Sequence, residues 1–202
     1  MTKQRTYDRV ARLYDLLDLP FERRRYHPIR PEMFRGLSGT ILDAGVGTGR
    51  NMPFYPDGAD MTGIDLSPHM LARARRRRDR LGVRVQLREM DVTACDFPDN
   101  HFDHAVATFL FCVLDPTDQL PALRELARIC RPDGTIRLLE YCYSADPWHR
   151  FVMRLWAPWV HFAYGAGFDR DTERYVADAN LTLESSRFVY RDVIKLLELR
   201  VK

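Results

Sequence analysis

Short apolar runs alternate with helix-like stretches along most of this 202-residue chain. This alternation constrains the fold most strongly, because it favours parallel β-α-β units with helices on both faces of one sheet. Ligands of such sheets bind at the carboxyl ends of the strands. The pattern therefore predicts an α/β fold with its site at that edge. The predicted strands are residues 40–44, 60–64, 83–90, 102–111 and 135–143.

Helical signals occupy three stretches between these strands, residues 50–55, 68–81 and 118–131. Ser67 and Pro68 supply an N-cap and a first-turn proline for the second stretch, and Gly82 stops it. Near the end of the chain, residues 181–190 and 193–201 are two extended runs in close succession. They predict an antiparallel hairpin that adds two strands to the edge of a mostly parallel, seven-stranded sheet.

Composition fits one soluble domain over residues 1–202, with 46% hydrophobic and 29% charged residues. The four cysteines are widely spaced and the histidines are not clustered, so we expect neither a metal site nor a disulfide framework. The sequence shows no apolar signal core and no apolar run of the roughly 20 residues that a spanning helix needs. We therefore expect a cytoplasmic protein, with peripheral association at the inner face of the membrane as a further option.

The net charge of +3 is concentrated at one end, since residues 1–35 carry a net +4. This basic arm combines arginines with apolar residues at helical spacing. One interpretation is an amphipathic helix on an anionic membrane surface, and the other is a lid packed on the core; a lid can also make the membrane contact. The oligomeric state stays open, with a monomer as one option. The apolar residues of the arm are Tyr7, Val10, Ala11, Tyr14, Leu17 and Phe21.

The segment DAGVGTG, residues 43–49, is the sharpest local motif and lies between the first strand and the next helix. Its glycines can take positive φ and let the backbone approach a ligand, although a plain turn can also carry them. Asp65 ends the second strand, where a carboxylate can accept both hydroxyls of a ribose. Asp43 would repel a pyrophosphate but could pair with a cationic amino acid group. Asp91 and Val92 suit an adenine.

Four segments, residues 41–50, 62–67, 90–92 and 97–103, resemble successive motifs of class I S-adenosylmethionine-dependent methyltransferases. Residues 126–134 are similar to the helix-to-strand turn of that family. The resemblance extends over most of the chain and implies a Rossmann-like fold. It also implies S-adenosylmethionine as the cofactor and S-adenosylhomocysteine as the product. The motifs are specific for the cofactor and much less specific for the acceptor.

The resemblance assigns each matching residue a part of the cofactor. The glycines would pass under the methionine portion, Asp43 would lie near its amino group, and Asp65 would hold the ribose. Leu66 would pack on adenine, while the end of the fourth strand would face the sulfonium. The implied cofactor-binding residues are Tyr14, Asp43, Gly45, Gly47, Gly49, Asn51, Asp65, Leu66, Asp91, Val92, Thr108 and Phe109.

A narrower resemblance concerns the acceptor. The N-terminal pattern Y-D-x-x-A-x-x-Y-D, the phrase FLFC at residues 109–112 and the segment VIKL at 193–196 resemble soluble bacterial phospholipid N-methyltransferases. This resemblance implies phosphatidylethanolamine as the acceptor. The alternative is C-, O- or S-methylation of a quinone or another small hydrophobic molecule. Two other classes stay open: a nucleotide-binding Rossmann module or dehydrogenase, and a non-catalytic cofactor-binding protein.

Nucleic acid is not an expected partner. Residues 107–112 lack the N/D-P-P-Y/F motif of methyltransferases that act on nucleic-acid bases or glutamine. The arginine-rich run at residues 73–80 fits a solvated helix face, with weak RNA or membrane affinity as the minor interpretation.

An amine acceptor must lose a proton before or during transfer, so a neighbouring tyrosine, histidine or carboxylate is expected. The candidates are Tyr14, Glu140, Tyr141 and His149, each of which could instead be a buried hydrogen-bonding residue. Many relatives have Glu-His where this chain has Glu140-Tyr141. The aromatic segment 146–168 follows and is either a cap over the acceptor pocket or an ordinary buried helix pair.

Overall fold

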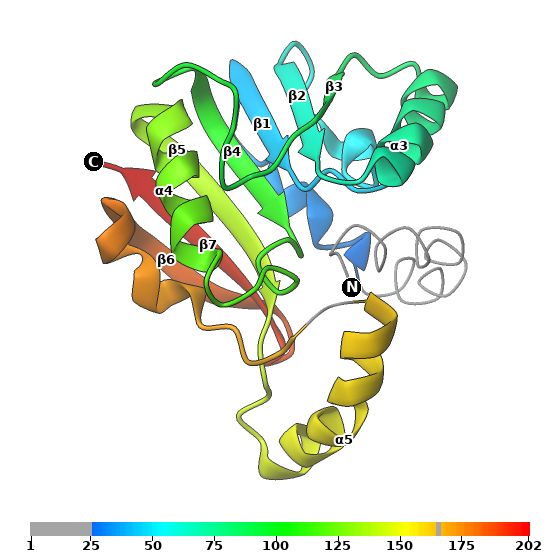
Figure 1. The fold of residues 1–202 in the computed structure, drawn as a ribbon, viewed down its shortest axis with the longest axis vertical. Helices are drawn as coiled ribbons and strands as arrows, with labels where there is room; N and C mark the ends of the chain where they lie inside the picture. Colours follow the sequence, from blue (N-terminus) through cyan, green and yellow to red (C-terminus); the bar gives the residue numbers. More distant parts are fainter. Residues whose placement is uncertain (1–25, 165–166) are drawn as a thin grey trace.

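Seven strands form one mixed sheet in the computed structural model, which describes residues 26–164 and 167–202. Their order across the sheet is β3-β2-β1-β4-β5-β7-β6 (Figure 1). The first five strands are parallel, while β7 is antiparallel to both β5 and β6. The Rossmann-like prediction and the C-terminal hairpin are thus confirmed. The strands are β1 Thr40–Ala44, β2 Asp60–Asp65, β3 Gln86–Glu89, β4 Phe102–Thr108, β5 Cys130–Tyr141, β6 Leu181–Tyr190 and β7 Ile194–Val201.

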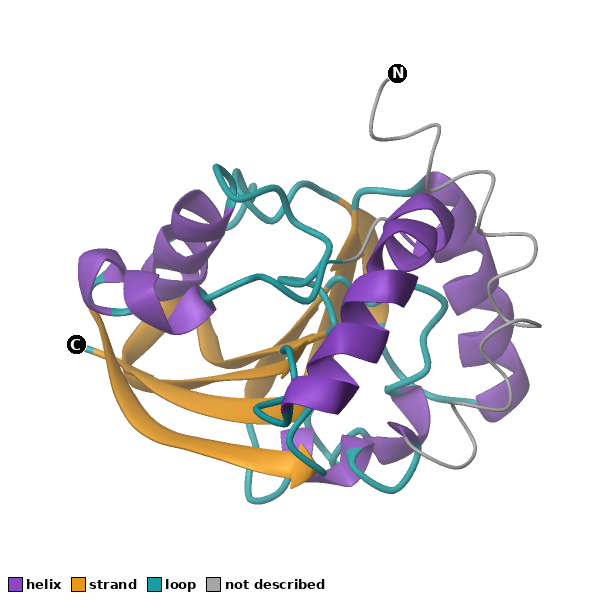
Figure 2. Cartoon of the chain, turned by 90° about the horizontal axis from the view of Figure 1, so that it is seen from below, coloured by secondary structure: helices purple, strands orange, loops and turns teal. Residues whose placement is uncertain are grey.

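Helices cover both faces of the sheet (Figure 2). On one face pack α3, Pro68–Leu81, and the 3-10 turns η2, Arg30–Met33, and η3, Met52–Phe54. On the other face pack α4, Gln119–Ile129, and the turns η4, Thr172–Tyr175, and η5, Ala177–Ala179. The helix α5, Pro147–Tyr164, extends away from the sheet (Figure 1). Residues 1–25 of the predicted arm lie outside the described residues.

The start of α3 follows the prediction closely. Ser67 Oγ accepts a hydrogen bond from Met70 N, and Pro68 occupies the first helical position. Gly82 ends the helix in the left-handed conformation with φ +65°. These are the N-cap, first-turn proline and C-terminal glycine that define a helix with clear limits.

The predicted helix at residues 50–55 is wrong, because only the short 3-10 turn η3 forms there. Pro53 lacks the backbone N–H that an α-helix would use, and Pro56 forces Tyr55 into an extended conformation with ψ 136°. The fourth strand also ends earlier than predicted, at Thr108, because Phe109 turns the backbone to φ +57°.

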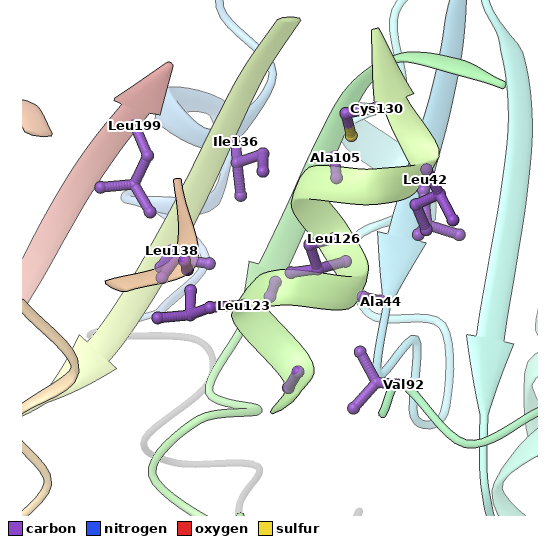
Figure 3. Packing of buried hydrophobic residues seen from close by; sticks show 14 of the residues in the cluster. Leu42, Ala44, Val92, Ala105, Leu123, Leu126, Cys130, Ile136, Leu138 and Leu199 are labelled. Carbon is purple, nitrogen blue, oxygen red and sulfur yellow. The ribbon is translucent and has the colours of Figure 1, made fainter. Parts of the chain in front are cut away.

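One hydrophobic cluster fills the space between α4 and the sheet (Figure 3). Leu123 and Leu126 project from α4 toward Leu42 of β1 and Ile136 of β5, and all four are fully buried. Continuous burial of this kind is what a parallel sheet covered on both faces requires.

Leu126→Ala should therefore lower the free energy of unfolding by about 2–5 kcal/mol, since it leaves a cavity in a close-packed core. Leu81→Ala is the matched control, because the Leu81 side chain at the end of α3 is 43% exposed. We expect the control to change stability by less than about 1 kcal/mol. Urea unfolding followed by circular dichroism measures both. Equal losses in the two variants would contradict this description of the core.

Candidate active site

The glycine loop after β1 is left-handed at each of its three glycines. Gly45, Gly47 and Gly49 have φ values of +69°, +55° and +79°. Non-glycine residues rarely adopt these angles, so the sequence motif is needed for this backbone path. A Cβ on Gly47 would meet no atom closer than 3.9 Å, so this part of the loop has open space beside it.

Asp65 ties the end of β2 to this loop. Its Oδ2 accepts from the backbone N of Gly47 at 2.9 Å, and its Oδ1 accepts from the backbone N of Ser67 at 2.9 Å. Burial raises the pKa of Asp65, while these two backbone donors oppose the rise. Leu66 follows it with a side chain that is 41% exposed, an apolar surface next to a carboxylate.

Asp43 lies fully buried at the end of β1, within a polar cluster. Asn51 Nδ2 donates to both of its carboxylate oxygens, at 3.0 and 3.1 Å, and the Tyr55 hydroxyl donates to Oδ2 at 2.7 Å. Arg30 Nη1 donates to Asn51 Oδ1 at 2.6 Å. Burial raises the pKa of Asp43 to about 6 despite these donors and the nearby Arg30 charge. A ligand cation beside Asp43 would favour its ionised form.

Asn51 also joins β1 to β4, because its Nδ2 lies 3.1 Å from Thr108 Oγ1. The same amide group thus orders Asp43, Thr108 and Arg30. The structure therefore brings together three of the predicted cofactor-binding residues, Asp43, Asn51 and Thr108, at the carboxyl edge of the sheet.

The two residues predicted to bind adenine, Asp91 and Val92, lie in different environments. Asp91 is exposed, and its Oδ1 accepts from the backbone N and hydroxyl of Thr93 at 2.9 and 2.8 Å. Val92 is only 6% exposed and packs in the cluster under α4 (Figure 3). Their assignment to an adenine pocket stays a prediction.

Aromatic rings gather where β4 and β5 end. The rings of Phe109 and Tyr141 are stacked with centroids 5.0 Å apart, and Tyr26 lies 5.1 Å from Phe109. The Tyr141 and Tyr26 hydroxyls are hydrogen-bonded to each other. Phe168, beyond α5, lies edge-on to Tyr141 at 5.7 Å. A face of three or four rings can hold an apolar group or a cation.

The four catalytic candidates do not form one group. Tyr141 belongs to the aromatic cluster, whereas Glu140 points to the opposite face of β5 and contacts Thr172. His149 is exposed in the first turn of α5, where its Nδ1 lies 3.0 Å from Asp146 Oδ1. Tyr14 lies outside the described residues.

Sequence reasoning missed Tyr26, Arg30 and Tyr55. The prediction counts Arg30 among the charges of the basic arm, yet it is 5% exposed and reaches the Asp43 cluster. No local pattern marks its burial. Tyr55 was assigned to a helix, although its position between prolines at 53 and 56 could have indicated a turn that directs its hydroxyl inward.

Comparisons with known proteins agree with this geometry. Residues 41–134 match the family model described as a methyltransferase domain. Phosphatidylethanolamine N-methyltransferase of Cereibacter sphaeroides is 40% identical over 105 residues, 51% of each chain. Demethylmenaquinone methyltransferase of Thermus thermophilus is 38% identical over 104 residues, 50% of this chain and 46% of that protein. The chain thus spans about half the length of these relatives.

The fold also matches solved structures. Geranyl diphosphate C-methyltransferase of Streptomyces coelicolor, solved with S-adenosyl-L-homocysteine, aligns with a TM-score of 0.70. The alignment covers 89% of this chain and 80% of that one at 17% identity. Residues 41–134 are a methyltransferase domain, and the whole sheet has the corresponding fold.

Two glycine substitutions test the loop. Gly47→Ala should lower the free energy of unfolding by about 1–2 kcal/mol, the cost of left-handed backbone at a residue with a Cβ. Gly45→Ala should cost about 1–3 kcal/mol more, because its Cβ would lie 2.8 Å from Leu110 Cδ1 and overpack the site. Urea unfolding measures both. A smaller loss for Gly45→Ala than for Gly47→Ala would contradict the loop geometry.

Proposed function

We propose that this methyltransferase domain transfers a methyl group from S-adenosylmethionine to a lipophilic acceptor at a membrane surface, with phosphatidylethanolamine as the best single candidate. The observation that carries the proposal is the buried Asp43 cluster beside a loop that is left-handed at all three of its glycines. It offers a carboxylate for a cationic amino group and open backbone for a closely packed ligand.

The residues present fit this cofactor. Asp43 would face the amino group, and the Asn51 amide would hold its carboxylate in place. Asp65 would accept from the ribose hydroxyls, since each carboxylate oxygen can accept more than the one backbone bond it has. The exposed Leu66 side chain would cover one face of the adenine. The loop spacing G-x-G-x-G differs from the dinucleotide pattern, which disfavours a dehydrogenase.

S-adenosylmethionine supplies an activated methyl group and a neutral thioether leaving group. The protein's part is to align the acceptor and keep water out. Phe109 and Tyr141 would do so by forming an apolar wall at the end of β4 and β5. When an amine attacks, the N–C bond forms, the C–S bond breaks, and one proton must leave the nitrogen. The hydrogen-bonded Tyr26 and Tyr141 hydroxyls are the proposed relay for that proton: one hydroxyl accepts it as the pair releases another proton to water.

The lipid acceptor is supported by the relative from Cereibacter sphaeroides, whose name states phosphatidylethanolamine as its substrate. Methylation of a quinone is the second candidate, supported by the demethylmenaquinone methyltransferase of similar identity. Both acceptors are lipophilic, so the aromatic cluster suits either.

An exposed apolar face of α5 supports the proposed contact with a membrane surface. Among the described residues, nine large hydrophobic side chains are exposed, and five of them belong to this helix. Four recur every three or four residues, so they share one side of the helix. The α5 segment also contains Arg150 and Arg154 but no Asp or Glu. Tryptophans with arginines and no acids match an anionic lipid surface. The α5 face consists of Trp148, Phe151, Leu155, Trp156 and Trp159.

Contact with lipid would be peripheral for the part of the chain seen here. Within residues 26–164 and 167–202, no helix is both long enough and apolar enough to cross a bilayer. A helix with one apolar face instead lies in the plane of the interface. Phe168 follows α5 in the chain and contacts Tyr141, which supports a headgroup contact close to the aromatic cluster.

Radiolabelled S-adenosylmethionine with phosphatidylethanolamine vesicles tests the reaction. We expect labelled lipid from the wild type and at least tenfold less from Asp65→Ala at limiting cofactor, because charged hydrogen bonds of about 1.5–3 kcal/mol are lost. Asp60→Ala is the matched control, since Asp60 is exposed at the other end of the same strand. It should retain the activity.

Two results would overturn parts of this proposal. Transfer to a demethylated quinone with no labelled lipid would replace the acceptor and leave the methyltransferase assignment intact. Thermal stabilisation by NADH but not by S-adenosylhomocysteine would instead favour a dehydrogenase and remove the assignment.

Vesicle binding tests the α5 face separately from catalysis. Phe151→Ser should weaken cosedimentation with anionic phosphatidylglycerol vesicles by about tenfold, since burying a phenylalanine contributes about 1.5–3 kcal/mol. Phe188→Ser is the matched control, an equally exposed phenylalanine on β6 (49% against 58%). Equal binding by both variants would contradict the proposal. So would a cross-link from Trp156 to the N-terminal segment or to a second copy in place of lipid.

A further inference from the structure

Three buried polar side chains form a hydrogen-bonded row at the end of β5, on the α4 side of the sheet. It joins Glu140 at the end of β5, Thr172 in η4 and Gln119 at the start of α4, whose exposed fractions are 6%, 2% and 1%. Thr172 Oγ1 lies 2.8 Å from Glu140 Oε2 and 2.9 Å from Gln119 Oε1. Gln119 Nε2 donates to the backbone carbonyl of Phe111 at 2.6 Å.

The orientation of the Gln119 amide follows from that last bond. A flipped amide would place Oε1 against the Phe111 carbonyl, two acceptors at 2.6 Å, so Nε2 must face Phe111. Gln119 Oε1 therefore faces Thr172, and a buried amide oxygen requires a donor. The Thr172 hydroxyl has one proton, and this oxygen needs it.

The proton count then determines the state of Glu140. With the Thr172 proton directed to Gln119, the 2.8 Å contact between Thr172 Oγ1 and Glu140 Oε2 lacks a proton unless Glu140 carries one. Among the described residues, Glu140 Oε1 is buried without a hydrogen-bond partner. An unpaired oxygen is far less costly in a neutral acid than in a carboxylate.

The electrostatics of the surroundings agree. Burial, helped by the charges of Glu173 and Asp171, raises the pKa of Glu140 to about 7, although the Thr172 hydrogen bond and the Lys195 charge oppose the rise. Lys195 is itself paired with Glu173 at 2.7 Å. The thiols of Cys112 and Cys142 lie near Glu140. Burial raises the pKa of both thiols, that of Cys112 to about 12, and a negative charge on Glu140 acts in the same direction.

The hydrogen-bonded row connects segments that carry the proposed site. Phe111 follows Phe109 by two residues in the turn after β4. On the other side, Gly167 N donates to Cys112 O at 2.7 Å, and Arg170 Nε donates to Leu114 O at 3.0 Å. The segment after α5, residues 167–172, is thus bonded to this turn at three points. The third contact, from Thr172 through Gln119 to Phe111, is fully hydrogen-bonded only when Glu140 carries a proton.

We propose that Glu140 is a neutral acid that donates through Thr172 to Gln119, and that this proton-dependent clamp positions the turn after β4 against the segment after α5. Glu140 is then a positioning residue and not the base in methyl transfer. Loss of its proton leaves two acceptors with one donor and loosens the clamp. This inference does not depend on the acceptor or on methyl transfer.

Infrared difference spectroscopy of the wild-type protein tests the proton directly. We expect a carbonyl band of protonated carboxylic acids at pH 6 that is lost by pH 8.5. Asp43, whose pKa is raised to about 6, contributes to this band, so Glu140→Gln should lose only the part that belongs to Glu140. Glu89→Gln, the same change at the end of β3, should keep the band. A band of equal intensity at pH 6 in the wild type and in Glu140→Gln would overturn the proposal.

Thermal unfolding tests the linkage. The folded acid holds its proton up to about pH 7, whereas the unfolded one releases it near pH 4.5. Its stabilisation is therefore complete below about pH 4.5 and is lost as pH rises to about 7. Relative to Glu140→Gln, which stays neutral, the wild-type Tm should fall by roughly 5 °C or more between pH 5 and pH 7.5. Parallel Tm curves for the two proteins would refute the linkage.

Hydrogen–deuterium exchange tests the clamp itself. At pH 8.5, peptides covering residues 109–114 should exchange faster in the wild type than in Glu140→Gln, and at pH 6 the two should match. Thr172→Val removes the relay and should exchange fast at both pH values. Identical exchange in all three proteins would show that the network does not position this turn.

Discussion

The side chain of Asn51 makes the bonds on which the candidate site depends most. One amide binds Asp43 at the end of β1, Thr108 at the end of β4 and Arg30 from η2. Adjacent parallel strands bring their carboxyl ends together, but they do not by themselves orient a buried carboxylate. The amide does so together with the Tyr55 hydroxyl, because each donates to a carboxylate oxygen that is buried away from water. Removing it would leave Asp43 and Arg30 as a buried charge pair without its connecting amide, which is costly in an apolar interior.

Two neighbouring residues of β5, Glu140 and Tyr141, lie on opposite faces of the sheet and make different contacts there. Side chains alternate along β5, so Tyr141 joins the aromatic cluster with Phe109 while Glu140 reaches Thr172 on the α4 side. Both were candidates for the same catalytic role. Alternation makes a shared role difficult, since the two side chains leave the sheet in opposite directions. A proton acceptor near the acceptor group and a neutral acid that positions the turn are therefore compatible assignments.

The parts of the fold that were predictable depend on local signals. The glycines at residues 45, 47 and 49 permit the left-handed backbone of the loop. Ser67 with Pro68 starts a helix whatever that helix packs against. Boundaries failed where non-local contacts decided them, as at Phe109, which leaves β4 in a left-handed turn. Arg30 could not be assigned from sequence, because its burial depends on Asn51, 21 residues away, and nothing local distinguishes it from the other arginines of the predicted arm.

The α5 face and the Glu140 clamp lie on one continuous path of the chain. The helix leaves the end of β5, exposes its tryptophans, and returns through Phe168 and the segment bonded to the turn after β4. Phe168 and Thr172 both follow within eight residues of the end of α5. Phe168 contacts Tyr141, and Thr172 contacts Glu140. An anionic surface also concentrates protons, which favours the neutral acid. In the proposed membrane-bound state, lipid contact and the closed clamp would therefore favour each other.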